Sequence, residues 1–100
     1  KNNPEFGANA KYYLAQIALN DQQYGQVIQE GLQLLSEYPD HEFNSEINRI
    51  VGESYYYEGD NDNAIQYLNR YVTNTKDPLR ESLYLLGIAY QGITRLPSNI

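Results

Sequence analysis

The sequence predicts an all-α protein built from antiparallel pairs of helices. Apolar residues recur at helical spacing throughout the chain, as they do where one face of each helix is buried. No stretch shows the sustained alternation of apolar and polar residues that indicates a half-buried strand. The connectors between the periodic segments are short, so neighbouring helices must run antiparallel.

The first two helices are expected over residues 8–20 and 22–37, and side chains with capping ability lie near the ends of the early helices. Asp21 can accept hydrogen bonds from the free backbone N–H groups of the second helix. Asn44 or Ser45 can do the same for the third helix. The apolar stripe of the first helix is formed by Leu14, Ile17 and Ala18.

The third and fourth helices are expected over residues 44–58 and 60–74, with an acidic corner between them. Gly59 fits just past a helix end, where a left-handed residue is needed, and Asp60 then caps the fourth helix. A calcium loop starting at Asp60 would need Glu at its twelfth position, which is Tyr71. The segment therefore predicts a helix-to-helix corner, with an adventitious ion as the alternative.

The fifth helix is expected over residues 78–93, with Asp77 as its cap and Pro78 as its first residue. Its packing stripe is expected to contain Leu79, Leu83, Leu86 and Tyr90. The residues left for another surface are Leu85, Ile88 and Ala89. We expect this apolar strip to be covered either by a continuing chain or by self-association through the C-terminal helix.

Length and composition exclude several classes of protein. One hundred residues make a single domain, 1–100, and Lys1 in place of an initiator Met predicts a piece of a longer chain. The net charge of −6, with scattered Lys and Arg, argues against nucleic acid as a partner. There are no cysteines for disulfides or thiolate sites, and no run approaches the ~18 apolar residues of a membrane span.

Catalytic and metal-binding patterns are weak in this sequence. His41 is the sole histidine, and it lies in an expected connector, where a solvated role is the common one. Ser36 and Asp40 complete the residue types of a catalytic triad, but a triad is defined by geometry rather than by proximity in sequence. We therefore expect no enzymatic activity, no catalytic residues, no metal and no cofactor.

The chain also repeats itself. A shift of 37 residues places Ala15 on Gly52, and a shift of 35 places Gly52 on Gly87. A small residue at one place in each odd-numbered helix lets a partner helix approach closely. The repeating unit is therefore a pair of helices.

The stretch VGESYYYEGDNDNAIQYL resembles the tetratricopeptide repeat family, whose unit is ~34 residues long with the pattern W-x2-L-G-x2-Y, then A-x3-F, then P. The family's L-G, Y, loop G, A and F places fall on Val51, Gly52, Tyr55, Gly59, Ala64 and Leu68. LLGIAY also matches, through Leu86, Gly87 and Tyr90. The resemblance implies a short right-handed solenoid of about two and a half repeats, at 8–39, 44–76 and 78–93.

The resemblance further implies a scaffold that binds a protein or peptide on a concave face lined by the first helix of each pair. The candidate residues of this groove are Tyr12, Gln16, Leu19, Arg49, Glu53, Tyr56, Tyr84, Ile88 and Gln91. Their aromatic and amide character suits a peptide, although they could equally be solvated or fill the inner curve. Arg49 is the only cation among them, and is expected to anchor a carboxylate or carbonyl of the partner.

The chaperone-binding members of the family use a clamp of Lys, Asn and Arg, and two of these places are occupied here by Tyr12 and Gln16, so a chaperone tail is not the expected partner. Two other functions stay open: a structural spacer in a longer repeat protein, and a carbohydrate-handling accessory domain. LLSEYPDHEF is also similar to exported bacterial members, such as outer-membrane assembly lipoproteins. This similarity implies the periplasm or cell envelope, with the cytoplasm as the alternative.

Overall fold

A computed structural model describes residues 4–94 of the chain. This part contains helices α1 (Pro4–Asn20), α2 (Tyr24–Glu37), α3 (Asn44–Tyr57), α4 (Asn61–Thr73) and α5 (Arg80–Thr94). No strand occurs within residues 4–94, which confirms the predicted all-α class. None of these helices is long and apolar enough to cross a membrane.

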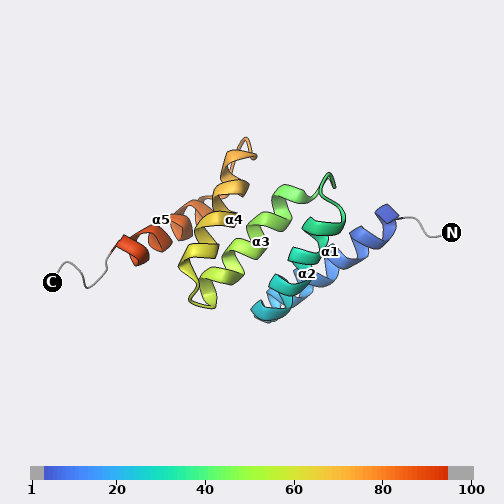
Figure 1. Cartoon of the computed structure of the whole chain (residues 1–100), viewed down its shortest axis with the longest axis horizontal. Coiled ribbons are helices and arrows are strands. Elements are labelled where there is room, and N and C mark those ends of the chain that lie inside the picture. Colours follow the sequence, from blue (N-terminus) through green and yellow to red (C-terminus); the bar gives the residue numbers. More distant parts are fainter. Residues whose placement is uncertain (1–3, 95–100) are drawn as a thin grey trace.

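The helices follow one another along the length of the molecule, and each folds back on the one before it (Figure 1). Helix α3 lies at the centre and contacts the other four helices. The alternate helices α1, α3 and α5 therefore form a continuous layer. Within the described residues, the backbones of α2 and α4 do not come close to each other.

Two hydrophobic clusters hold this arrangement together. The larger lies between α1, α2 and α3 and is centred on Val27, Leu34 and Ile47, which are almost completely buried. The smaller joins α4 to α5 through Leu68 and Leu85. Full burial of one such aliphatic side chain stabilises the fold by about 1.5–3 kcal/mol.

Close helix packing depends on glycine in the middle of α3. A Cβ atom built on Gly52 would lie 2.7 Å from Cγ of Leu68 and 2.9 Å from its backbone N, both too close for a real contact. Gly52 therefore lets α4 approach as closely as it does. The predicted close contact at this position is confirmed, whereas no atom lies within 4 Å of a Cβ built on Gly87.

The corner between α3 and α4 is as predicted. Gly59 has a φ of +87°, and Asp60 accepts a 3.1 Å hydrogen bond from the backbone N of Asn63. The N–H groups of Gly59 and Asp60 donate to the carbonyls of Tyr56 and Tyr55, in the Schellman pattern of a helix C-terminus.

The corner between α1 and α2 uses the same pattern, and this makes the Asp21 prediction wrong. Gln22 has a φ of +59°, and the N–H groups of Gln22 and Gln23 donate to the carbonyls of Leu19 and Ala18. The residues after α1 are therefore used to end that helix. Helix α2 begins at Tyr24, without a side-chain cap.

Two other predicted caps are also wrong. Helix α3 begins at Asn44, and Phe43 before it has no capping side chain. Helix α5 begins at Arg80, so Asp77 and Pro78 lie in the connector. The hydroxyl of Tyr71 instead accepts a 2.9 Å hydrogen bond from the backbone N of Leu79, which fixes the entry to α5.

The buried faces of the two terminal helices are rotated from those predicted. In α1, Leu14 and Ile17 are 53% and 56% exposed, and the buried stripe is Ala8, Tyr12, Ala15 and Ala18. In α5, Leu83 and Tyr90 are more than 40% exposed, as is Leu79 just before the helix. The buried stripe of α5 is Ser82, Leu85, Leu86 and Ala89. Each buried stripe contains small residues, which allow these helices to lie close to α3.

Candidate functional site

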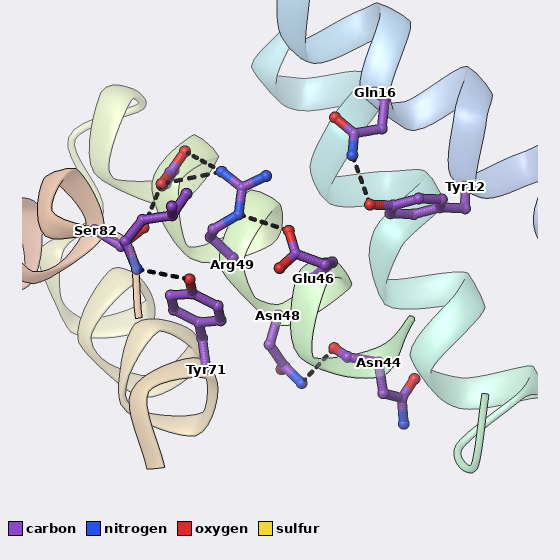
Figure 2. A network of polar contacts seen from close by, with 10 residues as sticks. Tyr12, Gln16, Asn44, Glu46, Asn48, Arg49, Tyr71 and Ser82 are labelled. Atoms are coloured by element: carbon purple, nitrogen blue, oxygen red, sulfur yellow. Dashed lines mark hydrogen bonds and ion pairs between the residues drawn. The ribbon is translucent and has the colours of Figure 1, made fainter. Parts of the chain in front are cut away.

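The middle of α3 carries a polar network on the side that lies between α1 and α5. Nε of Arg49 donates to Glu46 at 2.9 Å, and Nη1 contacts both carboxylate oxygens of Glu53 at 3.3 Å. Oε2 of Glu53 also accepts a 2.8 Å hydrogen bond from Oγ of Ser82 on α5. Figure 2 shows the Arg49 side chain between Glu46 on its own helix and Ser82 on α5.

The network is largely shielded from water. The side chain of Arg49 is 14% exposed and that of Glu53 is 9% exposed. Burial works to lower the pKa of Arg49, but the charges and hydrogen bonds of Glu53 and Glu46 outweigh it and raise the pKa. Arg49 is therefore a fixed positive charge, held by two carboxylates. Within the described residues its Nη2 atom has no hydrogen-bond partner.

Tyr12 and Gln16 lie on α1 and are joined by a hydrogen bond. Nε2 of Gln16 donates to the hydroxyl of Tyr12 at 2.6 Å (Figure 2). The Tyr12 ring packs at 4.6 Å on Phe43, and only 6% of the residue is exposed. Burial is the main cause of a raised pKa at this hydroxyl, which the bond from Gln16 partly offsets. Tyr12 is thus a core residue that offers a partner little surface.

Leu19 also packs against the core and is not a fully exposed binding residue. It is half-buried against the cluster that contains Val27 and Ile47. Of the three candidates on α1, Gln16 is therefore the one whose polar group lies nearest to a usable surface.

Three predicted residues meet near the C-terminal ends of α3 and α5. Tyr56, Ile88 and Gln91 line a small hollow of about 180 Å³, together with Asn61 and Gly92. The Tyr56 ring also packs on the Leu68–Leu85 cluster. The hollow is therefore formed where α5 crosses the corner between α3 and α4.

Tyr84 lies apart from the Arg49 network and does not line the small hollow near Tyr56. It is 67% exposed, on the side of α5 that faces away from α3. It lines a shallow hollow of about 440 Å³ with Leu83, Gly87, Ile88 and Gln91. The nine candidates thus lie in four places: on α1, in the Arg49–Glu53 network, around the small hollow near Tyr56, and at Tyr84 on the outer end of the molecule.

Tyr57 was predicted to face the groove or its rim, although it is not one of the nine candidates. It stacks on Tyr24 of α2 at 5.0 Å, yet 46% of it is exposed. Its pKa is raised, first by burial and then by the negative charges of Glu81 and Glu53. Glu46, Arg49, Glu53 and Tyr57 are spaced at three or four residues, so they share one face of the helix.

The potential metal ligands of the described residues are dispersed. No group of three or more His, Cys, Asp or Glu residues within 4–94 could hold a metal ion. Nε2 of His41 lies 2.9 Å from Oδ1 of Asn9, and its Nδ1 accepts a hydrogen bond from the backbone N of Phe43. His41 therefore fastens the α2–α3 connector to α1, which is a structural task.

Taken together, the chain is an all-α protein with a repeat-like succession of helices and a polar network at its centre. Comparison with protein-family models, with curated proteins and with solved structures finds no match for it. The functional argument therefore depends on the geometry of the chain itself.

Proposed function

We propose that the chain is a helical-repeat binding module, similar to tetratricopeptide repeats, that holds a peptide segment of a partner protein along α1, α3 and α5. The observation that carries the proposal is the asymmetry of the helix contacts. Helix α3 packs closely on both α1 and α5, whereas the backbones of α2 and α4 do not come close to each other. A stack whose alternate helices touch on one side only is expected to curve toward that side, which supports a concave face there.

The two helix corners support the repeat. Gln22 and Gly59 both have a left-handed backbone, and each follows a helix that ends with the same pair of hydrogen bonds. They lie 37 residues apart, which is the shift that aligns Ala15 with Gly52. The same backbone event at the same place in two successive units is what a repeat architecture requires.

The polar network gives the proposed face a specific donor. Arg49 is held in one orientation by Glu46 and Glu53, and its Nη2 atom is left to bind a partner. Because two carboxylates already surround the guanidinium, a neutral carbonyl oxygen of a peptide fits this donor better than a further carboxylate. Tyr57 lies on the same face of α3 and adds exposed aromatic surface beside it.

The experiment is selection of binding peptides from a random library, followed by titration of the 15N-labelled chain with a selected peptide. We expect chemical-shift changes along Gln16, Arg49 and Tyr57, and little change on the outer faces of α2 and α4. A peptide that shifts only α2 and α4, or a selection that yields no binder, would refute the groove. The latter result is the one that a purely structural spacer predicts.

A pair of variants then tests the donor itself. Arg49→Lys keeps a positive charge opposite Glu46 and Glu53 but removes the donor at Nη2. It should weaken the selected peptide by about tenfold, since losing a hydrogen bond from a charged donor costs about 1.5 kcal/mol or more. Gln66→Ala changes an exposed residue of α4 and serves as the matched control, with unchanged affinity expected.

A further inference from the structure

The outer face of α5 is exposed and apolar, and it is nearly free of charge. Leu83 and Tyr84 are 45% and 67% exposed on this helix, and Leu79, which directly precedes it, is 49% exposed. Arg80 and Glu81 are its only charged residues, both in the first turn, so the helix is formally neutral in a chain of net charge −6. A second copy of the chain can therefore approach this face without the repulsion that the rest of the molecule would impose.

The hollow at the centre of this face has a counterpart inside the molecule. Gly87 corresponds to Gly52 in the 35-residue shift. At Gly52 the side chain of Leu68 lies directly over the glycine, and α4 runs antiparallel to α3. At Gly87 no atom comes within 4 Å of an added Cβ. The surface around Gly87 thus has the form that accepts an antiparallel helix with a leucine over the glycine.

We propose that a second copy of the chain occupies this hollow, through antiparallel pairing of two α5 helices around a two-fold axis. Leu83 precedes Gly87 by one helical turn, so the face carries both a projecting leucine and a glycine hollow. In an antiparallel pair, Leu83 of each copy lies over Gly87 of the other. The face is therefore complementary to itself, as a closed dimer requires.

An alternative contact would use the exposed apolar residues of α1. Its Leu14 and Ile17 could receive α5 of another copy. Such a head-to-tail contact uses two different surfaces, leaves one of each unfilled, and builds open chains of increasing length instead of a dimer. Stoichiometry therefore separates the two arrangements.

The dimer is expected to be weak. One helical face from each copy is smaller than the roughly 800 Å² per partner of a standard interface. Sedimentation velocity from about micromolar to about millimolar concentration should show a monomer converting to a dimer, with no larger species. A strictly monomeric chain over that range would overturn the proposal, and so would growth beyond the dimer.

Two substitutions locate the contact without disturbing the fold, because both positions are exposed. Gly87→Leu fills the hollow and Leu83→Ala removes the side chain that enters it, and each should weaken dimerisation by about tenfold or more. Ile17→Ala on α1 is the control and should leave the dimer unchanged. Dimers that survive both α5 changes, or that are lost with Ile17→Ala, would assign the contact to another surface.

Cross-linking tests the antiparallel direction. The chain contains no cysteine, so Leu83→Cys and Gly87→Cys each introduce a unique thiol. The proposed pairing brings Cβ atoms of position 83 in one copy and 87 in the other to about the 3.5–4.5 Å that a disulfide needs. Mixing the two variants should therefore give disulfide-linked dimers faster than either variant alone. Equal rates in the mixture and in the separate variants would refute the antiparallel register.

Discussion

The close approach of α4 to α3 predicts opposite effects for the same substitution at Gly52 and at Gly87. At Gly52 an added methyl group would lie 2.9 Å from the backbone N of Leu68, about half an ångström short of an ordinary contact. Since backbone cannot rotate away as a side-chain tip can, α4 must move. At Gly87 the methyl group meets open space.

The magnitudes follow from two terms. Alanine is favoured over glycine within a helix by about 1 kcal/mol at either position. Overpacking at Gly52 costs about 1–3 kcal/mol, and no such cost applies at Gly87. Gly87→Ala should therefore stabilise the chain by up to about 1 kcal/mol. The Gly52→Ala variant should be less stable than the Gly87→Ala variant by about 1–3 kcal/mol, the cost of overpacking, because both variants gain the same helix propensity.

Urea unfolding followed by circular dichroism measures both variants against the parent chain. The protein is kept as dilute as the signal allows, so that pairing through α5 does not contribute. In thermal unfolding of a chain of this size, 1 kcal/mol corresponds to about 4–8 °C in Tm. Equal free energies of unfolding for Gly52→Ala and Gly87→Ala would refute the close contact and the reasoning built on it.

Three further predictions concern single residues. Gln22→Gly should stabilise the chain by about 0.5–1 kcal/mol, because glycine adopts the left-handed backbone after α1 without strain. Gly59→Ala should destabilise the chain by about 1 kcal/mol for the converse reason. Free energies of unfolding in urea that change in the same direction for both variants would contradict this. Tyr12→Phe should reduce the loss of stability in alkali. The raised pKa of Tyr12 contributes stability that is complete below pH 10.0 and is lost as the pH rises through the folded-state pKa. Free energies of unfolding measured below and above pH 10.0 test this, and the same pH dependence in the variant and the parent would contradict it. Ser54→Ala should be neutral or stabilising by up to about 1 kcal/mol, because the buried Oγ has no partner among the described residues. Ser82→Ala should cost about 1–3 kcal/mol, because it removes the hydrogen bond to Glu53. Equal changes in the free energy of unfolding for the two variants would contradict this prediction.

One helix corner could be predicted from local sequence, whereas three helix caps and the features set by distant contacts could not. The Gly59–Asp60 corner is encoded by neighbouring residues, and it was predicted correctly. The buried face of α1 was not predicted, because the sequence offers both Leu14 and Tyr12 for burial and the packing of Tyr12 on Phe43 comes from a distant part of the chain. Within residues 4–94, α1 and α5 each have helix neighbours on one side only, and each carries more apolar residues than those neighbours bury.

The candidate site divides in the same way. Arg49 and Glu53 are one turn apart on a single helix, and their shared face could be predicted from spacing. Ser82, which completes the network, comes from α5, and its approach to Glu53 depends on how α5 crosses α3. No spacing within the sequence encodes that crossing. Tyr12 was assigned to the surface for the related reason that its burial depends on a connector residue far along the chain.

The central position of α3 has a consequence for how the chain folds. Each helix contacts only the next one or two along the sequence, so the loops that must close during folding are short. Chains dominated by such contacts fold rapidly, on the microsecond-to-millisecond timescale. Because α3 is the one helix in contact with all the others, structure is expected to start there with α2 or α4 and to spread outward. Amide hydrogens in α1 and α5 should therefore exchange with solvent well before those in the middle of α3.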